Sequence, residues 1–117
     1  MNSSADHDRL QLVVSNAAAD QLDAAEEEAA AIVDKAMAAQ AWRLISQVKA
    51  NMQRFVAAVS SMDIALQHQP DSRVLRVERA LLLERSGAAE QALAEFESLA
   101  RELVDSPGLL VHLARNL

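Results

Sequence analysis

The sequence contains no cysteine, only two glycines and two prolines, and only three aromatic residues among its 117 positions. Without cysteine the chain can form neither disulfides nor reactive thiolates, which fits a reducing compartment. Two glycines leave little material for the strained loops on which active sites depend. Runs of β-branched and aromatic residues between turn signals are also too few to build a sheet.

Long apolar runs and an excess of positive charge are missing as well. No uninterrupted apolar stretch approaches the roughly 20 residues of a membrane span, and the polar, partly acidic N-terminus lacks the pattern of a signal peptide. The formal net charge is −6, whereas phosphate binding needs clustered Lys and Arg. We therefore expect a cytoplasmic protein that binds neither membranes nor nucleic acids.

What the chain does contain is a large share of strong helix formers. Apolar residues make up 51% of it, mostly Ala and Leu, which predicts an all-α fold. Residues 1–15 are polar and predict a flexible lead-in, and residues 16–38 predict an Ala-rich, acidic helix. Because residues 16–69 hold neither Gly nor Pro, one long helix is an alternative to three shorter ones. Asn51 and Gln53 mark the favoured break.

One dipeptide points to an internal repeat. Asp71-Ser72 recurs as Asp105-Ser106, 34 positions later, and the surrounding residues keep the same register. Pro70 forces the preceding residue out of helical geometry, and Gly87 suits the left-handed end of a helix. The spacing predicts helix–turn–helix units over residues 39–72 and 73–106, with a partial third unit over residues 107–117.

Packing residues within these units carry a family resemblance. The second unit has Gly87 at its turn and Ala92 and Phe96 on its second helix, and the first unit has Trp42, Ala58, Met62, Ala65 and Pro70 at matching places. The pattern resembles the tetratricopeptide repeat, although Gln53 replaces the turn glycine in the first unit. The resemblance implies antiparallel helix pairs stacked in a short array, with Trp42 as a packing residue. It also implies a protein–protein interaction scaffold.

In that family the first helix of each unit lines a groove that receives a peptide or a partner helix. Carried over by register, the groove residues are Gln40, Arg43, Leu44, Gln47 and Asn51, followed by Val74, Val77, Glu78, Leu81 and Arg85. Val77 and Leu81 stand where the family's clamp for a C-terminal carboxylate needs polar groups, so we exclude that ligand. An apolar groove flanked by Arg43 and Arg85 favours an amphipathic helix. The competing interpretation is that the N-terminal helix or a second copy of the chain fills this surface.

Two charged stretches have simpler interpretations than a binding site. Arg73, Arg76 and Arg79 could meet an acidic partner, but we expect a solvated face paired with Glu78, Glu84 and their neighbours. The run from Glu26 to Glu28 is expected to be the wet side of a helix.

Residues for chemistry are not evident. His7, His68 and His112 are far apart in the sequence and lack a partner at metal-ligand spacing, so no metal site is predicted. We find no nucleophile motif, phosphate loop or catalytic carboxylate pair, and we expect no catalytic residue and no cofactor.

Two alternatives to a partner-binding scaffold stay open. Bacterial transferases and hydroxylases carry similar repeats ahead of their catalytic domains, and Leu117 falls inside the first helix of the third unit. The chain could therefore be the N-terminal module of a larger enzyme. The other alternative is self-assembly as a homodimer, through exposed ends of the array or through the apolar seam from Trp42 to Leu66.

Overall fold

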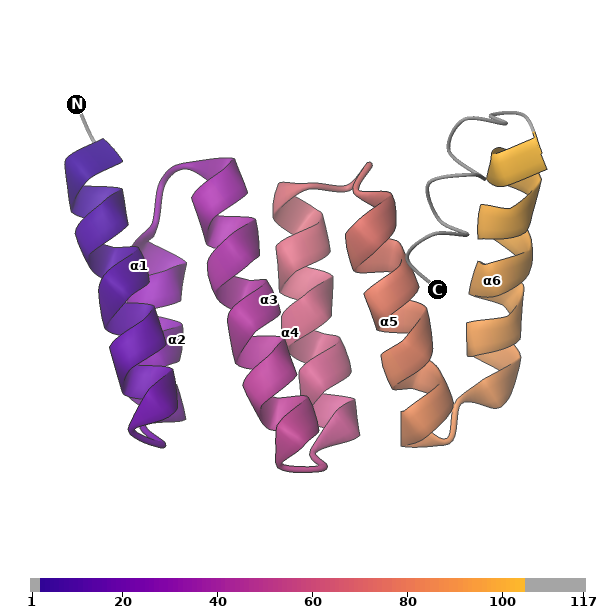
Figure 1. The fold of residues 1–117 in the computed structure, drawn as a ribbon, viewed down its shortest axis with the longest axis horizontal. Coiled ribbons are helices and arrows are strands. Elements are labelled where there is room, and N and C mark those ends of the chain that lie inside the picture. The colour runs from indigo at the N-terminus through magenta and orange to yellow at the C-terminus, as the bar shows by residue number, and fades with distance from the viewer. Residues whose placement is uncertain (1–2, 105–117) are drawn as a thin grey trace.

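The fold is an all-helical array, as the composition predicts. A computed structural model describes residues 3–104, and within this range the chain forms six α-helices and no strand (Figure 1). The helices are α1 (Ser3–Ala18), α2 (Leu22–Ala31), α3 (Lys35–Asn51), α4 (Phe55–His68), α5 (Arg73–Ser86) and α6 (Ala89–Val104). The partial unit predicted for residues 107–117 lies outside the described residues, as does His112.

The helices are arranged as three pairs, side by side in chain order (Figure 1). Helix α1 pairs with α2, α3 with α4, and α5 with α6, each through a short turn. Helix α3 also packs on both α1 and α2, and α5 packs on α4, so each pair is held by the one before it. This is the way in which helical repeats bury a continuous core that no single pair could bury.

The three turns within the pairs share one backbone geometry. Asp20 and Gln53 have a φ of 62° and Gly87 a φ of 96°, so all three are left-handed. In each turn the next amide donates to a carbonyl five residues earlier, from Gln21 at 2.8 Å and from Arg54 and Ala88 at 2.9 Å. This bond is the mark of a Schellman helix end. The α1–α2 turn thus has the same helix end as the turns of the two predicted units, although the sequence shows no matching residues there.

Residues 3–18 form helix α1, so the flexible lead-in expected for residues 1–15 is wrong. Val13 and Ala17 place an apolar stripe of α1 in the core. Asp6 is only 2% exposed, and its carboxylate accepts hydrogen bonds from the backbone amides of Val33 at 3.1 Å and Asp34 at 2.9 Å. The pKa of Asp6 lies below its usual value, chiefly because of the hydrogen bond from Val33 and next because of the one from Asp34. One buried carboxylate thus ties α1 to the turn between α2 and α3.

The region of residues 16–69 is broken in three places, and neither a single helix over 16–38 nor one long helix forms. The second break, between α2 and α3, needs no Gly or Pro because Asp34 caps α3 by accepting from the amide of Met37 at 2.9 Å. The third break follows Asn51, as the sequence favours, and Gln53 supplies its left-handed residue. The helix pair that corresponds to the predicted unit over residues 39–72 is α3–α4, and it begins at Lys35 rather than at residue 39.

Small side chains dominate the core, and this allows the helices to approach closely. Trp42 is buried, in keeping with a packing role, and Ile45 and Met62 are the largest side chains that are almost completely enclosed. Most other core positions are alanines, including Ala25 and Ala29 of α2. Each alanine buries little apolar area, so the stability of the array depends on many close contacts rather than on a few large side chains.

Candidate functional site

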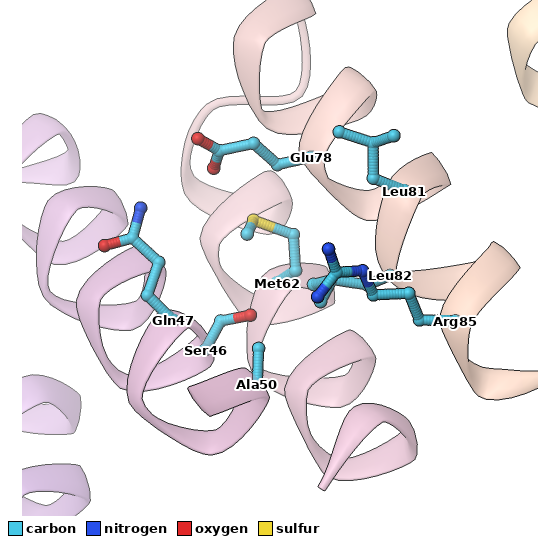
Figure 2. Close-up of a pocket in the computed structure, with 8 residues that line it drawn as sticks. All are labelled: Ser46, Gln47, Ala50, Met62, Glu78, Leu81, Leu82 and Arg85. Atoms are coloured by element: carbon cyan, nitrogen blue, oxygen red, sulfur yellow. The ribbon is translucent and has the colours of Figure 1, made fainter. Parts of the chain in front are cut away.

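An apolar pocket opens between α3 and α5, with α4 behind it (Figure 2). Its volume is about 250 Å³. Three helices contribute the eight residues that line it, which are Ser46, Gln47, Ala50, Met62, Glu78, Leu81, Leu82 and Arg85. The volume is below the roughly 300 Å³ at which small-molecule sites begin.

The pocket forms because α1, α3 and α5, the first helices of the three pairs, are not evenly spaced. Helix α1 packs directly against α3, whereas α3 and α5 each pack on α4 and have no comparable contact with one another. Two of the three side chains that α3 contributes to the lining are small, namely Ser46 and Ala50. They leave space that the side chains of α5 do not fill, since Leu81 is 47% exposed at the edge of the pocket.

The floor of the pocket is firmly held. Met62 of α4 is only 1% exposed and packs in the main core. The buried hydroxyl of Ser46 donates to the carbonyl of Ala58 at 2.7 Å, so α3 is bonded directly to α4 beside the pocket. Nearby, the Lys49 ammonium donates to the hydroxyl of the buried Ser61 at 2.8 Å. These bonds satisfy the buried hydroxyls of Ser46 and Ser61.

Lys49 also forms an ion pair with Glu26, the first residue of the acidic run from Glu26 to Glu28. Its ammonium lies 2.6 Å from the carboxylate of Glu26 on α2, and the Lys49 side chain is only 13% exposed. Glu26 is therefore a structural partner of α3 rather than part of a solvated face. Glu27 is exposed, as the interpretation of the run expects.

An ion pair spans the gap between α3 and α5. Arg43 Nε donates to both oxygens of Glu78, at 3.0 Å to Oε1 and 2.8 Å to Oε2, and Arg43 Nη2 also contacts Oε1. The hydrogen bonds to Glu78 raise the pKa of the Arg43 guanidinium still further, so the pair stays ionised. Both side chains are partly exposed, and the pair links the two walls without closing the pocket.

Arg85 stands at the opposite end of the α5 wall from Glu78 (Figure 2). Its guanidinium lies over the ring of Phe55, 5.9 Å from the ring centroid, and this contact holds the cation at the edge of the pocket. Among the described residues no carboxylate pairs with Arg85, in contrast to Arg43.

Half of the predicted groove residues meet at this pocket. Gln47, Glu78, Leu81 and Arg85 line it, and Arg43 reaches it through Glu78. The remaining predicted residues lie elsewhere: Leu44 packs partly buried against the core, Val74 and Val77 continue along α5 outside the lining, and Gln40 and Asn51 are exposed on α3 outside it.

The sequence does not identify the other four lining residues, Ser46, Ala50, Met62 and Leu82. Register assigns the groove to first helices alone, so Met62 of α4 is expected only as a packing residue. It becomes a floor because α3 and α5 stand apart, which no local pattern encodes. Ser46 and Ala50 give a weak signal, since small residues four apart on one helix face leave room for a neighbour.

Of Arg73, Arg76 and Arg79, the last two pair across helices, and the predicted pairing with Glu78 and Glu84 is wrong for them. Arg76 bonds to Glu95 at 2.9 Å and to Glu102 at 2.7 Å, both on α6. Arg79 contacts Asp63 of α4. Glu78 turns the other way, toward α3, because it lies on the groove side of the helix. These pairs fasten α5 to its neighbours.

The described part of the chain offers neither a metal site nor a membrane-spanning helix. Within residues 3–104 no three His, Asp or Glu side chains gather closely enough to hold a metal ion. None of the helices in the same range is long and apolar enough to cross a bilayer. No family model, curated protein or solved structure matches the chain. The site geometry is therefore the basis for a functional proposal.

Proposed function

We propose that the chain is a protein–protein interaction scaffold of the tetratricopeptide kind, and that it binds a partner helix or peptide between α3 and α5. The pocket over Met62 carries this proposal, because it is apolar, open and placed between the first helices of two consecutive units. A half-exposed Leu81 at its edge offers apolar area that an occupant would remove from water.

The polar groups of the pocket support binding rather than catalysis. The Ser46 hydroxyl already donates to the carbonyl of Ala58, and both oxygens of Glu78 already accept from Arg43. Among the eight lining residues there is thus no nucleophile beside a free base, which acyl or glycosyl transfer would require.

The test is a selection from a library of helical peptides, each displayed as an internal segment of a carrier protein. The immobilised wild-type chain is the target. We expect peptides that bind the wild type and lose binding to Leu81→Asp, because a carboxylate at the pocket edge disrupts apolar burial. Val56→Asp is the matched control, since Val56 is 71% exposed on α4 and does not line the pocket. Circular dichroism checks that both variants keep their helicity. Binders that tolerate Leu81→Asp, or no binders at all, would contradict the proposal.

A second candidate, self-association, is favoured by the two ends of the described array. Leu12 of α1 is 46% exposed, whereas Ile45, at the corresponding position of the next unit, is fully buried. Leu93 of α6 is 59% exposed, whereas its counterpart Val59 packs against the core. Light scattering over increasing concentration tests this candidate. We expect a dimer that Leu12→Glu or Leu93→Glu dissociates, and a monomer at every concentration would refute it.

A further inference from the structure

The pocket between α3 and α5 carries an unbalanced positive charge. Its single carboxylate, Glu78, is neutralised because Arg43 donates to both of its oxygens. Its single cation, Arg85, has no carboxylate partner in residues 3–104. An occupant therefore meets an apolar floor with one exposed guanidinium beside it.

The position of Arg85 leaves its hydrogen-bonding groups available. The guanidinium lies over the ring of Phe55, a cation–π contact that uses none of its N–H donors. The planar guanidinium can pair with a carboxylate through two parallel N–H···O bonds. The net charge of −6 would repel an acidic partner at long range. At physiological salt this repulsion is largely screened beyond about 8 Å, so the local pair with Arg85 decides the preference.

The apolar surface beside the pocket has the period of a helix. Val74, Val77 and Leu81 follow one another on α5 at spacings of three and four, and Val74 is 52% exposed. A partner helix lying along α5 can match this ridge with its own residues at the same spacing, whereas an extended chain at about 3.3 Å per residue drifts out of step.

The distance between the apolar and the charged feature is set by α5. Leu81 and Arg85 are four residues apart, which is about 6 Å along a helix axis. On an occupant helix in either direction, the same distance separates residues three or four apart. A carboxylate at that spacing from the residue in the pocket would therefore reach Arg85.

We propose that the groove selects an amphipathic helix in which a large apolar residue enters the pocket over Met62 and an Asp or Glu three or four residues away pairs with Arg85. This inference rests on the proposed function and adds the chemistry of the partner. The volume of about 250 Å³ suits Leu, Met or Phe as the anchor. The carboxylate is a side chain of the helix and not a chain terminus.

The experiment compares the peptides selected on the wild type with those selected on Arg85→Glu. We expect Asp or Glu three or four residues from the apolar anchor on the wild type, and Lys or Arg at that place on the variant. Synthetic peptides with amidated ends remove the terminal carboxylate as an alternative ligand. Changing the acidic residue of a wild-type binder to Lys should weaken binding about fivefold to tenfold. Arg85→Glu should restore it.

Arg101→Glu is the matched control, because Arg101 is exposed on α6 and the substitution changes the net charge equally. It should leave the peptide preference unchanged. Arg85→Gln serves as a second variant should the charge reversal disturb folding, and it should abolish the acidic preference without creating a basic one.

The two proposals fail in distinguishable ways. If no selected peptide is sensitive to Leu81→Asp, the proposed function fails, and the inference with it. If Leu81→Asp abolishes binding but the peptides show no acidic preference, or Arg85→Glu leaves that preference intact, only the inference is overturned. A synthetic peptide of residues 105–117 that displaces the selected binders would also overturn it, because the chain's own segment would then be the occupant.

Discussion

Replacing Gln53 by glycine should stabilise the protein. Gln53 ends α3 with a φ of 62°, in the region where a side chain is strained, and Gly87 has the corresponding place after α5 with a φ of 96°. The hydrogen bonds of the two turns are the same, so glycine can adopt the required angle at position 53 without altering the helix end.

The magnitude follows from two opposing terms. A left-handed backbone costs an ordinary L-residue roughly 1–2 kcal/mol. Glycine avoids this cost, but it loses more backbone freedom on folding, which offsets roughly 0.5–1 kcal/mol of the gain. We expect Gln53→Gly to raise the free energy of unfolding by about 0.5–1 kcal/mol. Urea unfolding monitored by circular dichroism measures the difference. We expect the slope of the unfolding free energy against urea concentration to stay unchanged.

The reciprocal variant Gly87→Ala isolates the backbone term. A Cβ added at Gly87 meets no atom within 4 Å, so the substitution creates no clash. It should lower the free energy of unfolding by about 0.5–1 kcal/mol. A destabilised Gln53→Gly protein, or a Gly87→Ala protein as stable as the wild type, would refute the reasoning.

Three further changes test the contacts that hold the array. Asp6→Asn should lower the melting temperature at pH 7; because the folded pKa of Asp6 is depressed, the deficit should be fully present above the unfolded pKa of about 3.9 and vanish as pH falls through the lower folded value. Thermal unfolding of both proteins between pH 7 and pH 2 measures this, and a deficit as large at the acid end as at pH 7 would contradict it. Ser46→Ala should cost about 1 kcal/mol in thermal unfolding through loss of the bond to Ala58, and a neutral result would show that the bond adds nothing. A double-mutant cycle of Arg43→Met and Glu78→Gln should give a coupling below about 1 kcal/mol that falls with added salt, whereas a larger, salt-independent value would mean that the pair is effectively buried.

The sequence predicts the helices where a pattern or a breaker is local. Pro70 and Gly87 punctuate α4, α5 and α6 unambiguously, and the all-α class follows from composition. The start of the array is harder, because α1 depends on Asp6, whose partners lie 27 and 28 residues away. A carboxylate in a polar N-terminal stretch resembles a solvated residue until the turn that it binds is known.

The candidate site is predictable to the same extent. The register identifies the α5 wall, including Leu81 and Arg85, since it follows from which side of a helix faces its neighbours. It does not show that α3 and α5 stand apart or that the buried Met62 forms the floor between them. That spacing depends on how α4 packs on both, which is a property of three helices together.

The unequal spacing of the first helices also bears on the curvature of the array. Helices α1 to α4 are joined by direct packing and by the Glu26–Lys49 pair, whereas α5 and α6 are attached mainly through α4. Across the groove the link between the two blocks is the partly exposed Arg43–Glu78 pair. The angle between the two blocks is therefore set mainly by the α4–α5 contact, which the Arg79–Asp63 pair reinforces. The curvature of the array beyond α4 thus depends on this one helix contact rather than on packing between successive first helices.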